Sequence, residues 1–439
     1  MNRLLLFGLT FLLLFGWKVT ASADLIFVVA AGLVFWVYLA SDVAFSRVDK
    51  AILVTLLLLA VYSGVLVVLH GAGDVQIMLR SLRALINYAG AAALVGVFHS
   101  IYYDRAPVAI VRYIYWALVA HAVLICLMFQ LAGLREAIYS LASTYEYVNR
   151  TAPMILGLRI PGLTYGLAGT SVVQLAGVLL LPAMLDGYAG RGGARLAVWI
   201  GAVLLMLSML LTGRSGLLLG AALVPLTFLL SKERRLSFAT VRRSVLYGLG
   251  LLILAAAVVG VIGIERLGQD LTYNLKQAEE VLEFFSEGGS TATTRQLGGM
   301  YFLPSDPMTL LFGSSNLGRG ELGYIPSDVG YVQLIFGGGL LGLALNMAPY
   351  FIGLWLCVGC YASGKRSLAA GTALILLSAL LFNFKELSLL TRNHWSIQSL
   401  LIATCALQML GERGRLAFRP HESSDMQTIA APTVPEVSA

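Results

Sequence analysis

Apolar stretches long enough to cross a membrane recur along this chain from Leu4 to Leu410. A bilayer core about 30 Å thick requires about 20 residues of helix for each crossing. Only 12% of the 439 residues are charged, whereas soluble domains carry about 25%. These charges are too few to cover a water-facing surface of this size, which excludes a soluble enzyme. The sequence predicts a polytopic membrane protein of the all-α class.

The hydropathy pattern predicts about twelve spans in a transmembrane helical bundle. They lie near 4–22, 25–41, 51–70, 81–102, 108–132, 163–185, 196–212, 216–231, 244–264, 331–362, 368–384 and 396–410. The stretch 331–362 is longer than one crossing needs. We therefore expect its first part to be an interfacial or re-entrant piece.

Lysine and arginine are concentrated in every second short loop, and such loops are typically cytoplasmic. Examples are Arg47 with Lys50, and Lys365 with Arg366. The pattern predicts that both termini are cytoplasmic and that the long segments 133–162 and 265–330 lie outside. It divides the chain into transmembrane helices over 1–264, a large outer loop with short amphipathic helices over 265–330, transmembrane helices over 331–410, and a disordered tail over 411–439.

Metal, disulfide and nucleic-acid sites are not expected. All four cysteines lie in apolar runs, and the single C-x-x-C pair, Cys357 and Cys360, has no second pair elsewhere. Such thiols behave as small apolar side chains. The net charge of +7 resides in short loops rather than in one basic patch. We therefore expect no cofactor, and the lipid bilayer rather than nucleic acid as a partner.

Arg214 is a charged residue that loop length does not explain, because it lies between two apolar runs in Leu211-Thr-Gly-Arg-Ser-Gly-Leu217. A lipid-facing charge at that depth costs roughly 2.5–3.5 kcal/mol or more. Arg214 is therefore expected to face the protein interior, and the alternative is a side chain that reaches the outer headgroups.

Other arginines lie on the same predicted side of the membrane. Arg295 follows two threonines at a predicted helix start, and Arg319 has glycine neighbours that allow a close approach to a phosphate. Arg159, Arg392, Arg80 and Arg83 also lie near the outer ends of spans. Several converging guanidinium groups can hold a diphosphate without a metal.

Asp328 precedes the apolar stretch that begins at 331. One interpretation is a helix cap. The other is a general base, since a desolvated carboxylate can take the proton of a substrate hydroxyl. In the last outer loop, a Lys385–Glu386 salt bridge and an interfacial anchor at His394 are the simplest interpretations.

The order of these parts resembles the Wzy-type O-antigen polymerase and O-antigen ligase superfamily. The resemblance covers about residues 150–345. It comprises the Thr-Gly-Arg-Ser-Gly turn, a large outer loop with an arginine after its first helix, Pro-Met-Thr-Leu-Leu-Phe-Gly-Ser at 307–314, and Asp-x-x-Tyr followed by Gly-Leu-Leu-Gly. Each motif is short, and their order together with the hydropathy profile supports the resemblance.

The resemblance implies a metal-independent glycosyltransferase of the GT-C type in the inner membrane. It would act at the periplasmic face on undecaprenyl-diphosphate-linked glycans to build O-antigen or exopolysaccharide, with a chain-length regulator as a further partner. Arg214 and Arg295 match the family's two diphosphate-binding arginines. The ligases usually place a His-Asn or His-Ser pair where this chain has Ser327 and Asp328, and this departure favours a polymerase.

Two alternatives stay open at this stage. The first is a ligase that transfers finished polymer to lipid A-core. The second is a transporter of lipid-linked oligosaccharides, which should carry ionisable residues in the middle of its spans. His121 is the main residue of that kind.

Overall fold

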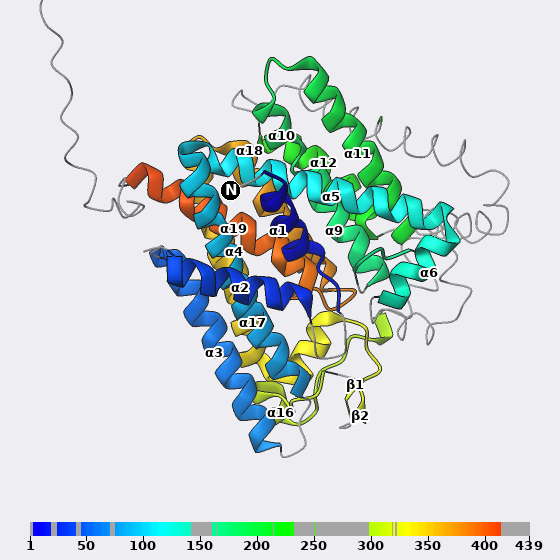
Figure 1. Cartoon of the computed structure of the whole chain (residues 1–439). Coiled ribbons are helices and arrows are strands. Elements are labelled where there is room, and N and C mark those ends of the chain that lie inside the picture. The colour runs from blue at the N-terminus through cyan, green and yellow to red at the C-terminus, as the bar shows by residue number, and fades with distance from the viewer. Residues whose placement is uncertain are drawn as a thin grey trace, which may run out of the picture.

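The computed structural model describes residues 3–18, 24–40, 45–70, 75–141, 160–164, 166–213, 215–231, 250, 298–317, 319–320 and 323–413. The regular elements of the described part are helices, apart from an antiparallel pair of two-residue strands, β1 (Arg319–Gly320) and β2 (Gly323–Tyr324), and an isolated bridge between Lys18 and Asp24. Figure 1 shows the helices α1 (Arg3–Phe15), α2 (Leu25–Ala40), α3 (Arg47–Leu69), α4 (Val75–Tyr102), α5 (Ala106–Gln130), α6 (Ala132–Leu141), α9 (Leu167–Leu179), α10 (Leu181–Gly187), α11 (Gly192–Thr212), α12 (Ser215–Leu230), α16 (Pro307–Phe312), α17 (Gly330–Ala362), α18 (Arg366–Phe382) and α19 (Arg392–Arg413).

Five helical stretches are long and apolar enough to cross a membrane. They are Arg47–Leu69, Val75–Gln130, Leu167–Gly187, Gly192–Thr212 and Gly330–Ala362. Shorter apolar helices cover Arg3–Phe15, Leu25–Val37, Ser215–Leu230 and Arg366–Phe382. The all-helical class is therefore confirmed, with five candidate membrane spans among the described residues. The predicted span 244–264, the amphipathic helices expected over 271–295 and the tail from 414 lie outside the described residues.

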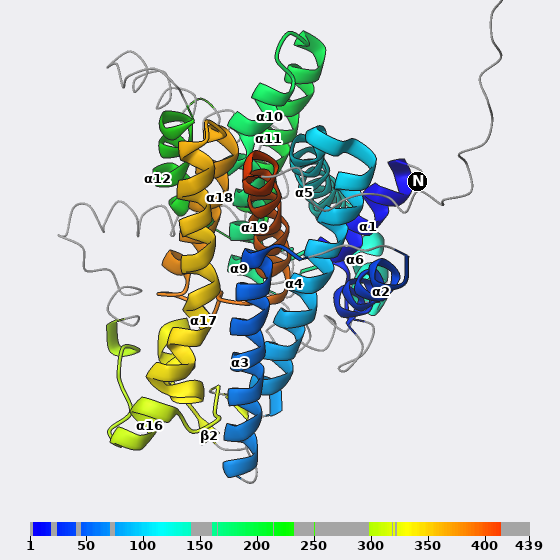
Figure 2. The ribbon, with the colours of Figure 1, turned by 90° about the vertical axis from the view of Figure 1, so that its left-hand side faces the viewer.

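The helices pack around two large apolar cores. One core joins α1, α2, α4, α5, α9 and α11, and the other joins α3, α4, α17, α18 and α19. α19 contributes side chains to both cores and passes between the surrounding helices in Figure 2. Its buried polar residues, among them Gln398, Ser399 and Thr404, show that it faces protein rather than lipid.

α17 is interrupted at Gly339, whose φ of 65° is not helical. A straight helix would separate Tyr331 from Tyr350 by about 28 Å. Both contact the same region instead, since the Tyr331 hydroxyl donates to Leu380 O (2.9 Å) and Leu390 N donates to the Tyr350 hydroxyl (2.9 Å). The piece before Gly339 therefore folds back beside the longer piece. The structure thus shows a break within the stretch 331–362, whose first part was expected to be an interfacial or re-entrant piece.

The break packs against α16 and α3. The Tyr62 hydroxyl of α3 bridges Phe312 O (2.7 Å) and Gly338 O (3.0 Å). A Cβ on Gly339 would lie 2.3 Å from Leu311 O, so only glycine fits there. The glycines at 337–339 therefore pack directly against the element at 307–314, as Figure 2 shows where α16 lies against α17.

Asp306 begins α16 by accepting hydrogen bonds from the amide and the hydroxyl of Thr309, each 2.8 Å long. These bonds hold the pKa of the Asp306 carboxyl below its ordinary value. A helix this short needs such a cap, because its first amides have no partner within the helix.

Several predicted span boundaries differ from the structure by four residues or more, two of them at α1 and α9. α1 ends at Phe15, whereas the predicted span continues to 22. The span predicted over 163–185 starts with a non-helical piece at 160–164, and its helix begins at Leu167. The cause of the second difference is a turn at Gly162, with φ of 64°, where Leu163 N donates to His121 Nε2 (3.0 Å).

Candidate functional site

Residues 383–394, between α18 and α19 and into the first turn of α19, contact most of the elements that the sequence motifs identify. We call them the junction segment. Asn383 gives it a compact shape, because its Oδ1 accepts from Ser388 N (2.9 Å) and Leu389 N (3.3 Å). The backbone oxygen of Asn383 also accepts from Tyr331 N (3.3 Å). The junction segment is therefore fixed to the start of α17.

The Thr-Gly-Arg-Ser-Gly turn lies on one side of the junction segment. Lys385 Nζ donates to Ser215 Oγ (2.9 Å), and Gly216 N donates to Ser171 Oγ of α9 (2.8 Å). A Cβ on Gly216 would lie 2.2 Å from Ser171 O, so the turn and α9 are in backbone contact. Arg214 itself lies outside the described residues, but its neighbours Gly213 and Ser215 place this turn beside Lys385.

Asp328 lies close to the junction segment as well. It is exposed, and Gly330, two residues later, packs so closely on Asn383 that a Cβ would lie 2.4 Å from Asn383 Oδ1. The N-cap position of α17 is Val329, and Ser327 Oγ accepts from Val329 N (3.2 Å). Asp328 therefore does not occupy the N-cap position, and Val329, which does, makes no side-chain cap hydrogen bond. The general-base interpretation of Asp328 stays a prediction.

The large outer loop supplies the third contact. The Tyr301 hydroxyl donates to Phe384 O in the junction segment, and Ser327 Oγ donates to Met300 O (2.9 Å). Partial desolvation raises the pKa of the Tyr301 hydroxyl above its ordinary value. Arg319 lies in β1 opposite Tyr324, and its side chain is outside the described part. Arg295 and Arg159 also lie outside the described residues.

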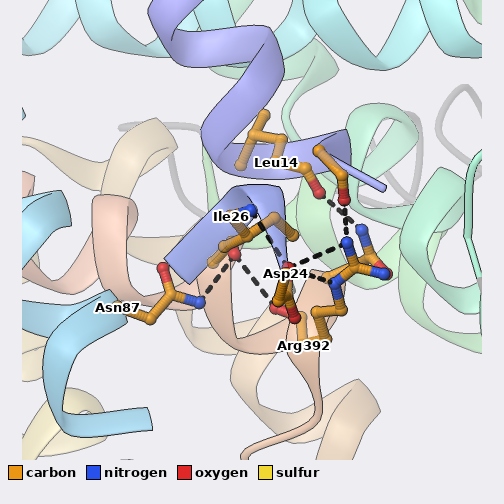
Figure 3. Close-up of polar contacts among 8 residues, drawn as sticks. Leu14, Asp24, Ile26, Asn87 and Arg392 are labelled. Atoms are coloured by element: carbon orange, nitrogen blue, oxygen red, sulfur yellow. Dashed lines mark hydrogen bonds and ion pairs between the residues drawn. The ribbon is translucent and has the colours of Figure 1, made fainter. Parts of the chain in front are cut away.

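Arg392 is held by Asp24 rather than presented to a ligand (Figure 3). Arg392 Nε and Nη2 lie 3.1 and 3.0 Å from Asp24 Oδ1, and Nη2 also donates to Gly16 O. Asn393 Nδ2 donates to Leu14 O (2.6 Å). Two side chains of α19 thus cap the carbonyl end of α1, while Asp24 caps α2 by accepting from Ile26 N (3.0 Å). The contacts explain why α1 ends early, and they indicate a structural role for Arg392.

The remaining residues singled out in the sequence have structural partners. Lys385 and Glu386 form a salt bridge at 3.9 Å with side chains 41% and 40% exposed, as expected. His394 Nε2 lies 3.0 Å from Gly169 O of α9, and its ring stacks on Phe382. Within the described ranges, no group of three His, Cys, Asp or Glu side chains could hold a metal ion.

His121 is a buried anchor. Its Nε2 accepts from Leu163 N, its Nδ1 lies 2.7 Å from Gln174 Nε2, and its ring stacks on Phe15 at 4.1 Å. Both ring nitrogens are therefore occupied by protein groups. This reduces the case for His121 as a proton carrier in a transporter.

Sequence analysis did not identify Asp24 or Asn383 as important residues. Asp24 pairs with Arg392, which is distant in the sequence, and Asn383 binds backbone amides. Residue spacing therefore gave no signal for either. No family model and no curated protein sequence matches this chain. A function for this chain is therefore inferred from its residues and their arrangement.

Proposed function

We propose that this protein polymerises undecaprenyl-diphosphate-linked oligosaccharide repeat units into O-antigen or exopolysaccharide. The observation that carries the proposal is that the junction segment contacts the Thr-Gly-Arg-Ser-Gly turn, the large outer loop and the start of α17. These three elements carry the resemblance to the polymerase and ligase superfamily. An arginine-bearing turn and an exposed carboxylate, Asp328, are thereby brought to one segment.

In the proposed reaction, a sugar hydroxyl of one lipid-linked unit attacks the anomeric carbon of the glycan on another. The bond from that carbon to the diphosphate oxygen breaks, and the diphosphate leaves with the electron pair. Asp328 takes the proton of the attacking hydroxyl. Arg214 and Arg295 bind the diphosphate, with Arg319 and Arg159 as further proposed contacts, and they stabilise its growing charge in the transition state.

The proposal includes a GT-C-like bundle of about twelve spans and needs no cofactor, since guanidinium groups neutralise the diphosphate. A chain-length regulator is a proposed partner. The ligase alternative is weaker because this chain has Ser327 and Asp328 where the ligases usually have a His-Asn or His-Ser pair. The Arg392–Asp24 ion pair favours a structural role for Arg392 over diphosphate binding.

The experiment that tests this function uses the purified full-length protein and a lipid-diphosphate-linked repeat unit. We expect a ladder of products that stay attached to the lipid, with the same yield in EDTA. A requirement for magnesium would contradict the arginine-based site. Transport of intact repeat units across proteoliposomes without new glycosidic bonds would contradict the polymerase itself.

The proposed orientation places the site at the periplasmic face of the inner membrane, with both termini cytoplasmic. Alkaline phosphatase is active only outside the cytoplasm. We therefore expect an active fusion after Ser290 and an inactive one after Ser237. The reverse pattern would place the arginines and Asp328 on the wrong side for this function.

A further inference from the structure

Arg80, in the second turn of α4, has a buried guanidinium that the protein satisfies only in part. Its Nη2 donates to Leu389 O in the junction segment. Its Nε and Nη1 are buried and have no hydrogen-bond partner. Buried cationic donors without acceptors are costly, and an arginine in a membrane span usually pairs with an acid or marks a ligand site.

Leu389 also contacts a second side chain that has an unsatisfied donor, Asn383. Asn383 Oδ1 accepts from Leu389 N (3.3 Å), while Asn383 Nδ2 is buried without a partner. Leu389 is thus held at its oxygen by a guanidinium and at its nitrogen by a carboxamide. Both groups keep donors unused, whereas the nearby Tyr350 hydroxyl donates its proton to Gln398 Oε1 (3.0 Å). The spare donors of a guanidinium and a carboxamide fit an oxyanion.

The position of this donor set relates it to the candidate site. The junction segment contacts the Thr-Gly-Arg-Ser-Gly turn at Lys385, the start of α17 at Asn383 and Leu387, and Arg80 at Leu389. Asp328 therefore lies near a segment that has an arginine-bearing element at each end. A polymerase needs to hold two lipid diphosphates, one on each side of its base.

We propose that Arg80 and Asn383 form a second phosphate-binding site, which holds the lipid diphosphate of the acceptor repeat unit while the Arg214 turn holds that of the donor. The inference rests on the proposed function. The phosphate chemistry would equally suit the headgroup of an anionic membrane lipid, so the test separates these two sources.

The test counts bound lipids by native mass spectrometry of the full-length protein with undecaprenyl diphosphate. We expect two bound lipids per wild-type chain. Arg80→Gln should bind one, because its affinity for the second lipid falls about tenfold or more. Arg105→Gln is the control, since Arg105 follows the opposite end of α4 and is exposed, and it should bind two. Two lipids on Arg80→Gln would overturn the second site and leave the polymerase proposal intact.

The variant Asn383→Asp separates loss of the phosphate site from loss of folding. The aspartate keeps the oxygen that accepts from Ser388 N and Leu389 N, and it places a negative charge near Arg80. We expect it to unfold at the wild-type temperature or above and to bind one lipid. Two lipids on this variant would overturn the inference.

Arg80-dependent binding of phosphatidylglycerol in place of the second diphosphate would support the phosphate site and overturn its assignment to the acceptor. Absence of any diphosphate binding by wild type would overturn the proposed function as well.

Discussion

Replacing Arg214 with lysine is expected to abolish or sharply shorten the polysaccharide chains while the protein still inserts at normal abundance. Lysine keeps the charge but loses the planar fork that binds a diphosphate through two parallel hydrogen bonds. By analogy with other preorganised donors, the loss should be on the order of 10² to 10³ in rate. The measurement is surface polysaccharide length on gels beside membrane abundance. Arg295→Lys should behave in the same way.

The matched control for Arg214→Lys is Arg195→Lys. Arg195 is an exposed residue near the start of α11, and Arg214 follows the end of the same helix. This control should give chains of normal length. If Arg214 only reaches toward headgroups, lysine serves equally well, and long chains from Arg214→Lys would rule out its role in diphosphate binding.

Removing Asp24 is expected to destabilise the whole bundle. Asp24 is 5% exposed and Arg392 16% exposed, so Asp24→Ala leaves a buried guanidinium without its counter-charge. Breaking a buried ion pair in this way costs about 3–5 kcal/mol. Asp24 also caps α2, and Arg392 joins α1 to α19. We expect low membrane abundance and a large fall in the thermal unfolding temperature of the purified protein.

Glu386→Ala is the control for that loss, because the Lys385–Glu386 pair is 3.9 Å long and about 40% exposed on each side. Exposed pairs contribute about 0–1 kcal/mol, so its abundance should match wild type. A second comparison uses Asp24→Asn with Arg392→Gln, which removes both charges and should recover part of the stability. Wild-type melting of Asp24→Ala would show that the ion pair does not hold the N-terminal helices.

The helices and the interruption of α17 could be predicted because they depend on local sequence. Apolar length predicts spans, and a stretch longer than one crossing needs predicts a separate first piece. α19 was predicted by its apolar pattern although it carries many buried polar residues. Gln398 accepts from the Tyr350 hydroxyl of α17, and Thr404 donates within α19 to Leu400 O.

The contacts that assemble the candidate site could not be predicted in the same way. Arg392 and Asp24 are 368 positions apart, and Arg80 and Leu389 are 309 apart. No spacing rule connects such residues, because their proximity follows from helix packing. For the same reason, the sequence could group Arg392 with the outer arginines but could not show that Asp24 already binds it.

Asp328 offers the most direct measurement of the central claim, that the junction segment assembles a site for glycosyl transfer. The measurement is the rate at which the purified protein extends a lipid-diphosphate-linked repeat unit, for wild type and for Asp328→Asn. The asparagine keeps the size of the side chain and any capping ability, but it cannot accept the hydroxyl proton as a base. We predict ladder formation by wild type and none by Asp328→Asn at equal folding and equal lipid binding. Equal rates for the two proteins would contradict the account.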